Sequence, residues 1–99
     1  MHLIVWRFAV RPEHRSSFEQ AYGPTGDWAR LFGRAAGYAG TELVALSDPG
    51  AYLTLDRWES AAAFAEFKHA WSQDYAELDQ RLERLTDEET FIGSGDAVT

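Results

Sequence analysis

The chain has 99 residues, of which 45% are hydrophobic and 25% are charged, a balance that excludes the disordered and fibrous classes. We therefore expect one globular domain that spans residues 1–99. Nine Lys and Arg residues against sixteen Asp and Glu give a formal net charge of -7, which disfavours nucleic acid and anionic membranes as partners. Cysteine is absent, which excludes disulfides and thiolate metal sites and fits the reducing cytoplasm, where we expect the protein to reside.

The first third of the chain predicts one strand followed by two short helices. Residues 2–10, HLIVWRFAV, are β-branched and aromatic, and Arg7 interrupts them, so they indicate a strand rather than a signal peptide or a membrane span. Residues 13–22 predict a helix that the following Gly-Pro pair interrupts. A second helical piece has apolar residues at helical spacing and ends at Gly37, which suits a C-cap. Its apolar positions are Trp28, Leu31, Phe32, Ala35 and Ala36.

The middle of the chain predicts a β-hairpin. Residues 38–47, YAGTELVALS, and residues 52–60, YLTLDRWES, are both rich in β-forming side chains. The segment between them contains Ser-Asp-Pro-Gly, residues 47–50, which is a turn by composition. We therefore expect the two runs to pair as antiparallel strands.

The last part of the chain predicts two helices and a short strand. Ser60 is a suitable N-cap for a helix whose apolar stripe contains Phe64, Phe67 and Trp71. Ser72 is a suitable cap for a further helix, and residues 88–94 predict the last strand. The resulting order of elements, β-α(α)-β-β-α(α)-β, is that of a ferredoxin-like α+β sandwich with its helices on one face of an antiparallel sheet.

Both faces of this predicted sheet carry apolar side chains. In the first strand Leu3 and Val5 lie on one face, whereas Ile4 and Phe8 lie on the other. The helices can cover only one face, and a large exposed apolar face on a water-soluble protein usually marks an interface. We therefore predict a homodimer in which two sheets pack face to face.

The run YLTLDRWESAAAFAEFKHA, in which a strand ending in Trp leads into a helix with the pattern S-x-x-A-F, suggests a family. Together with the order of elements, it resembles the antibiotic biosynthesis monooxygenase-like domain of the dimeric α+β barrel superfamily, and the resemblance covers nearly the whole chain. It implies a homodimer and a pocket between the helices and the sheet, lined by Trp58. The superfamily contains cofactor-free monooxygenases, haem-degrading enzymes and isomerases, so the resemblance leaves the activity open.

The chain departs from the catalytic members of this superfamily at one residue type. It contains no Asn, whereas the asparagine-dependent oxygenases use that amide to orient the substrate or oxygen. At the position in the first strand where haem-degrading members carry a pocket-facing Asn, this chain has Arg7. The asparagine-dependent mechanism therefore does not transfer to this sequence.

Two adjacent charges at the end of the third strand need separate partners. Because strand side chains alternate, Asp56 shares a face with Thr54 and Trp58, and Arg57 lies on the opposite face. We predict that Asp56 and Arg7 both face the helices and form an ion pair, which is either a substrate anchor or a purely structural pair. Arg57 is predicted to point into the dimer interface, where Glu42 or Glu59 would pair with it.

His69 is the histidine closest to the predicted pocket, and imidazole suits both a general base and a haem ligand. Its helical phase differs from that of Phe67 and Trp71, so an ordinary rim or surface histidine is the competing interpretation. A set of helical aromatic residues could wall a cavity for a flat molecule or simply form the core. This set is Trp28, Phe32, Phe64, Phe67, Trp71 and Tyr75.

If the chain is an enzyme, the resemblance implies a cofactor-independent oxygenation of a small aromatic or phenolic substrate. In that hypothesis Arg7 and Asp56 are catalytic, with Arg7 as the electrostatic partner of the substrate anion, while Trp58 lines the pocket. A non-catalytic ligand-binding or stress-response dimer is the alternative, and a haem-handling enzyme is a third. We expect no cofactor and no metal, because the acidic run at residues 87–89 has no second group of ligands.

Overall fold

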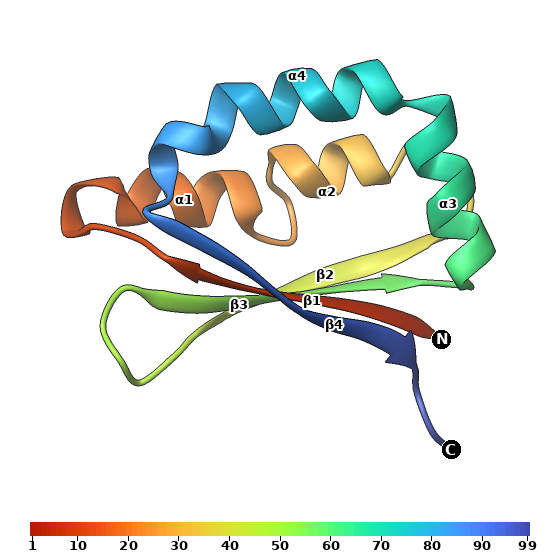
Figure 1. Ribbon diagram of the computed structural model, residues 1–99, viewed down its shortest axis with the longest axis horizontal. Helices are drawn as coiled ribbons and strands as arrows, with labels where there is room; N and C mark the ends of the chain where they lie inside the picture. Colours follow the sequence, from red (N-terminus) through yellow and green to blue (C-terminus); the bar gives the residue numbers. More distant parts are fainter.

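A computed structural model describes all residues from 1 to 99. Its four strands form one antiparallel sheet in the order β2-β3-β1-β4, and all helices lie on one side of it, which confirms the predicted ferredoxin-like α+β sandwich (Figure 1). The elements are β1 (His2–Ala9), α1 (Arg15–Tyr22), α2 (Asp27–Phe32), β2 (Tyr38–Ala45), β3 (Ala51–Trp58), α3 (Ala61–Ala70), α4 (Ser72–Leu82) and β4 (Glu88–Asp96), with single 3-10 turns at Pro12–His14 and Glu83–Leu85.

Local sequence explains most element boundaries. The Ser60 hydroxyl accepts a hydrogen bond from the Ala63 N–H at 3.1 Å, so the predicted cap of α3 is confirmed. Gly50 has φ of 81°, which a side chain would strain, in the turn between β2 and β3. The predicted C-cap at Gly37 is wrong, because α2 already ends at Phe32 and Gly33 follows it. No helix has the length and apolar character needed to cross a membrane.

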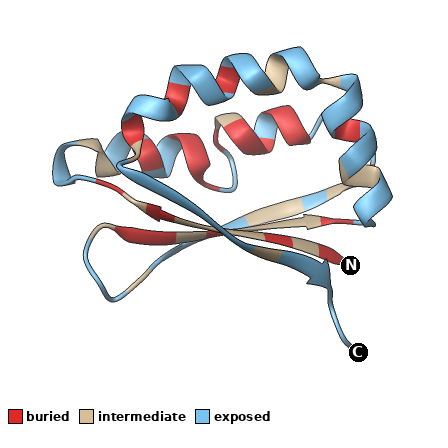
Figure 2. Cartoon of the chain, viewed as in Figure 1, coloured by how far each residue is buried: buried red, intermediate tan, exposed pale blue.

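The register of the sheet decides which side chains meet the helices. In the antiparallel pair of β1 and β3, Ile4 lies opposite Asp56, Trp6 opposite Thr54 and Phe8 opposite Tyr52. Ile4, Phe8, Tyr52 and Thr54 are buried, so this is the face that the helices cover (Figure 2). The odd-numbered residues of β1 therefore lie on the other face.

The core occupies the layer between the helices and this face of the sheet. Trp58, Phe18 and Phe67 are its largest fully buried side chains. The ring centres of Trp58 and Phe67 are 5.3 Å apart, and this contact joins β3 to α3. Because a strand residue and a helix residue share one tightly packed cluster, the helices are held against the sheet by aromatic contacts.

No part of the chain covers the other face of the sheet (Figure 1). This open face presents a group of partly buried or exposed apolar side chains together with a few charged ones. Its apolar members are Leu3, Val5, Val44, Leu53 and Leu55. The sheet is therefore apolar on both faces, as the alternation in β1 predicts, and the homodimer stays a prediction.

Candidate functional site

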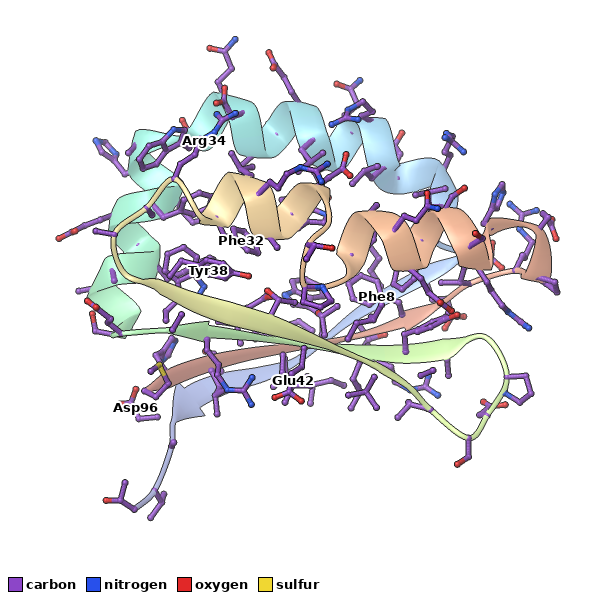
Figure 3. The ribbon with its side chains drawn as sticks, turned by 180° about the vertical axis from the view of Figure 1, so that it is seen from behind. Phe8, Phe32, Arg34, Tyr38, Glu42 and Asp96 are labelled. Atoms are coloured by element: carbon purple, nitrogen blue, oxygen red, sulfur yellow. The ribbon has the colours of Figure 1, made fainter.

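A cavity of about 140 Å³ lies between the helix layer and the covered face of the sheet. Six aromatic residues from four elements form most of its wall, and Figure 3 shows Phe8 and Phe32 between the helices and the sheet. The six are Trp6, Phe8, Tyr22, Trp28, Phe32 and Tyr75. A cavity of about 150 Å³ lined by apolar side chains is large enough to hold benzene, so this one suits a single aromatic ring.

Most neighbouring rings of the wall meet at tilted angles, whereas Trp6 and Phe8 are stacked with an interplanar angle of 26°. The ring centre of Trp28 is 5.0 Å from that of Tyr75 and 5.7 Å from that of Phe32, with interplanar angles of 59° and 32°. The ring centres of Phe8 and Tyr22 are 5.1 Å apart, with an interplanar angle of 60°. Such contacts hold the ring edges and faces in defined positions, which gives the cavity a fixed shape.

Asp56 is a partly buried carboxylate in this wall, and no basic side chain pairs with it. Its Oδ1 accepts a hydrogen bond from the Thr41 hydroxyl at 2.7 Å, and the Tyr38 hydroxyl lies 2.6 Å from the same Thr41 oxygen. Burial raises the pKa of Asp56 from 3.8 to about 6, although the hydrogen bond from Thr41 acts in the opposite direction. Thr41 has one hydroxyl proton, so Tyr38 donates to Thr41 whenever Thr41 donates to an ionised Asp56.

The predicted ion pair between Arg7 and Asp56 is wrong. Arg7 lies opposite Leu53 in the β1–β3 pair, on the open face, and its nearest carboxylate is Asp48 at 3.9 Å. The even-numbered residues of β1 face the helices, and Asp56 lies opposite one of them, Ile4. Arg7 is odd-numbered, so its side chain lies on the other face of the sheet from Asp56. It does not line the cavity.

The prediction for Arg57 is confirmed in one respect. Arg57 lies on the open face and pairs with Glu42 of β2, one of the two carboxylates proposed for it. Figure 3 shows Glu42 on the side of the sheet away from the helices. Asp56 and Arg57 are thus neighbours in sequence with separate environments.

The other predicted site residues divide into two groups. Trp28, Phe32 and Tyr75 line the cavity together with Asp56. Four others do not line it: Trp58, Phe67, Trp71 and His69. Trp58 and Phe67 belong to the core, Trp71 packs against the core, and His69 is exposed on α3, as its helical phase indicated.

Sequence reasoning missed five residues of the wall. Trp6 and Phe8 alternate with Arg7 in β1, so consistent use of strand parity would have placed them in the cavity instead of Arg7. Tyr22 is the last residue of α1 and is buried, and nothing in the predicted helix of residues 13–22 distinguished it from a core residue. No pattern in the sequence indicated that Asp79 and Glu89 line a cavity, because both resemble ordinary exposed acidic residues of a helix and a strand.

Negative charge surrounds the polar part of the cavity. Partial loss of hydration, followed by the nearby charge of Asp79, raises the pKa of Glu89. Burial raises the pKa of the Tyr75 hydroxyl to about 12, and the charges of Asp79, Asp56 and Glu89 contribute in the same direction. Trp28 also has a buried indole N–H without a hydrogen-bond acceptor.

The arrangement can hold one aromatic ring and offers a carboxylate that accepts a proton near neutral pH. No three His, Cys, Asp or Glu side chains lie close enough together to hold a metal ion. The side chains of the wall can accept or donate a proton and can exclude water from a bound ring.

Comparisons with known proteins point to one family. The model of the family described as antibiotic biosynthesis monooxygenase matches residues 1–71. Among solved structures, SnoaB, a cofactor-independent oxygenase from Streptomyces nogalater, superposes with a TM-score of 0.69 at 21% identity, covering 99% of this chain and 93% of its own. A protein from Deinococcus radiodurans assigned to the same monooxygenases has a TM-score of 0.77 at 17% identity, covering 100% and 94%. Rv0793 from Mycobacterium tuberculosis has a TM-score of 0.66 at 18% identity, covering 99% and 98%. No protein with a curated description matches the chain.

Proposed function

Because the chain belongs to the antibiotic biosynthesis monooxygenase family, we propose that it is a cofactor-independent monooxygenase that oxidises a small phenolic substrate in the aromatic cavity. The observation that carries this proposal is Asp56, a carboxylate without a cationic partner inside a wall of aromatic rings. The description of SnoaB as a cofactor-independent oxygenase supports the same reaction class for this fold.

Asp56 is the proton acceptor in the proposed reaction. The substrate hydroxyl transfers its proton to an Asp56 carboxylate oxygen, and the resulting phenolate becomes electron-rich enough to reduce O2. One electron passes from the phenolate to O2, and the superoxide then bonds to a ring carbon that carries a hydrogen. The resulting peroxide anion takes the proton back from Asp56 and becomes a hydroperoxide. Loss of water from the hydroperoxide leaves a quinone, so one oxygen atom enters the product and the other leaves in water with two substrate hydrogens.

Five residues around this step have supporting roles. The hydrogen bond from Thr41 fixes the orientation of the Asp56 carboxylate, and the hydroxyl of Tyr38 orients Thr41 in turn. The rings of Trp6, Phe8 and Trp28 belong to the wall that keeps bulk water from the intermediate. Arg7 has no part in this mechanism, since it lies on the other face of the sheet.

Oxygen consumption with a panel of one-ring phenols and hydroquinones tests the proposal. We expect Asp56→Asn to lower kcat by about a hundredfold or more, because positioned proton transfer contributes on that scale. Glu88→Gln is the matched control. Glu88 is exposed and lies opposite Ala9 in the β1–β4 pair, so its carboxylate is on the open face. Equal turnover by Asp56→Asn and the wild type would refute the assigned role. Native-state binding of a phenol without oxygen uptake would instead support the non-catalytic ligand-binding module.

Haem is a poor fit to this site. The cavity of about 140 Å³ suits one ring rather than a porphyrin, and His69 is exposed on α3 rather than directed at the cavity wall. A haem-handling activity is therefore not part of the proposal.

We also propose that the protein forms a homodimer through the open face of the sheet. Support comes from the apolar group around Leu53 and Leu55, which nothing in the chain covers. Light scattering is expected to give about twice the chain mass of 11.2 kDa for the wild type and a monomer for Leu55→Glu. Ala65→Glu introduces the same charge on the exposed surface of α3 and should remain dimeric. A wild-type monomer would exclude the proposal.

A further inference from the structure

The charged residues that line the cavity are all acidic. Asp56 enters from β3, Asp79 from α4 and Glu89 from β4, whereas no Lys, Arg or His is among the lining residues. The Nζ of Lys68 lies 4.0 Å from the ring centre of Tyr75, but Lys68 does not line the cavity. Arg81, close to Asp79 on the same helix, pairs with Asp27 instead. The cavity therefore offers no charge partner to an anionic ligand.

The side chain of Tyr75 is itself a phenol in the cavity wall, so its pKa indicates how the cavity affects the ionisation of a phenolic hydroxyl. Its raised pKa shows that burial and the three surrounding carboxylates oppose ionisation of that hydroxyl. A bound phenol in the same surroundings meets the same opposition. A positive charge on the substrate would offset the field of the carboxylates and make loss of its hydroxyl proton to Asp56 easier.

The aromatic wall also suits a cation. Ring faces attract ammonium groups, and the contact between Lys68 and Tyr75 is an instance of this attraction at the edge of the same wall. Asp79 lies one helical turn after Tyr75, so its carboxylate and that ring share one side of α4. An ammonium group near them would contact a ring face and a carboxylate together.

The two ends of the cavity lie far enough apart to receive the two ends of one molecule. Asp56 lies opposite Ile4 of β1 and Glu89 lies opposite Phe8, so their positions differ by about 13 Å along that strand. A para-substituted ring places a hydroxyl and an amino side chain at opposite ends. The ring then fills the aromatic part of the cavity between them.

We propose that the substrate is a one-ring phenol with a cationic amino side chain, bound with its hydroxyl at Asp56 and its ammonium group at Asp79 and Glu89. This inference rests on the proposed monooxygenase function and names its substrate class. Asp79 and Glu89 are specificity-determining residues in this assignment, and Asp56 remains the proton acceptor. Phenols with a carboxylate side chain are excluded by charge.

Three probes that share a para-hydroxyphenyl ring test the assignment. Tyramine is cationic, tyrosol is neutral and para-hydroxyphenylacetate is anionic at about pH 7.5, where the side-chain amine keeps its proton. Isothermal titration calorimetry of the full chain is expected to show tyramine binding about tenfold more tightly than tyrosol, because two partly exposed ion pairs contribute roughly that much. The anion should bind most weakly. Added salt should reduce the preference for tyramine, since the rim carboxylates are partly exposed to solvent.

The double variant Asp79→Asn with Glu89→Gln should lose the preference for tyramine over tyrosol while keeping its melting temperature. Glu77→Gln with Glu88→Gln removes the same two charges from exposed positions that do not line the cavity, and it should retain the preference. Equal affinity for the three probes, tighter binding of the anion, or no binding of any probe would overturn the assignment. So would an undiminished preference in the double variant.

Oxygen uptake separates this inference from the proposed function. If tyramine is preferred but no phenol of the panel supports oxygen uptake, the monooxygenase function fails and the binding specificity stands. If tyrosol or a hydroquinone supports uptake that depends on Asp56 while tyramine has no advantage, the specificity fails and the function stands.

Discussion

The two faces of the sheet give the adjacent charged residues Asp56 and Arg57 different surroundings. Asp56 lies on the covered face, among aromatic rings, with a hydroxyl rather than a cation as its partner. Arg57, the next residue, lies on the open face and pairs with the carboxylate of Glu42. Burial opposes the charge of Asp56, whereas the partly exposed Arg57 lies beside an acid. A buried carboxylate without a cationic partner is what the proposed role of Asp56 as a proton acceptor requires.

The largest expected difference between the two faces concerns packing. Trp58 is fully buried on the covered face, so Trp58→Ala should lower the free energy of unfolding by about 3–5 kcal/mol, as large-to-small changes in aromatic cores do. Urea denaturation followed by circular dichroism measures this loss. Leu3→Ala is the comparison, because Leu3 is partly buried on the open face. If Leu3→Ala lowered the free energy of unfolding more than Trp58→Ala at low protein concentration, the covered face would not be the one that contributes more to stability.

The second expected effect concerns the buried charge. The folded-state pKa of Asp56 is about 6 and its unfolded value about 3.8, so the native state binds more protons between these values and loses stability as pH rises through them. Asp56→Asn should therefore raise the free energy of unfolding by about 2–3 kcal/mol above pH 7 and by little below about pH 4. Denaturation curves at both pH values measure the difference.

Arg57→Gln provides the control for that prediction, because it changes the neighbouring residue on the open face. Its partly exposed pair with Glu42 should contribute no more than about 1 kcal/mol to the free energy of unfolding. A pH-independent effect of Asp56→Asn would contradict the raised pKa. Activity should show the opposite trend to stability, since the proton acceptor works only when it is ionised, and kcat should fall as pH drops below about 6.

The smallest expected effect concerns Arg7. Because Arg7 lies on the open face, Arg7→Met should change the dissociation constant of a bound phenol by less than about twofold. Calorimetric titration of tyrosol into the variant and the wild type makes the comparison. A tenfold loss of affinity with an unchanged oligomeric state would mean that the cavity does reach Arg7.

Sequence reasoning predicted the fold well and the site in part. The order of strands and helices, the cap at Ser60 and the placement of Asp56, Trp28, Phe32 and Tyr75 around a cavity between the helices and the sheet agree with the structure. The ion pair of Arg7 with Asp56 failed because each strand was assigned its face separately, without the register that joins them. Trp58 appeared to belong to the pocket because a large ring at a strand end suits both a wall and a core.

What the sequence by itself determined is local. The alternation in YLTLDRWES sends Asp56 and Arg57 to opposite faces, and helical spacing assigns each helix an apolar side, because both patterns follow from backbone geometry within a few residues. Only the tertiary structure decided which groups share the cavity. Asp79 and Glu89 come from α4 and β4, and their charges meet that of Asp56 only after these elements pack around the sheet. The acidic character of the site is therefore a property of packing between distant segments, which no local pattern contains.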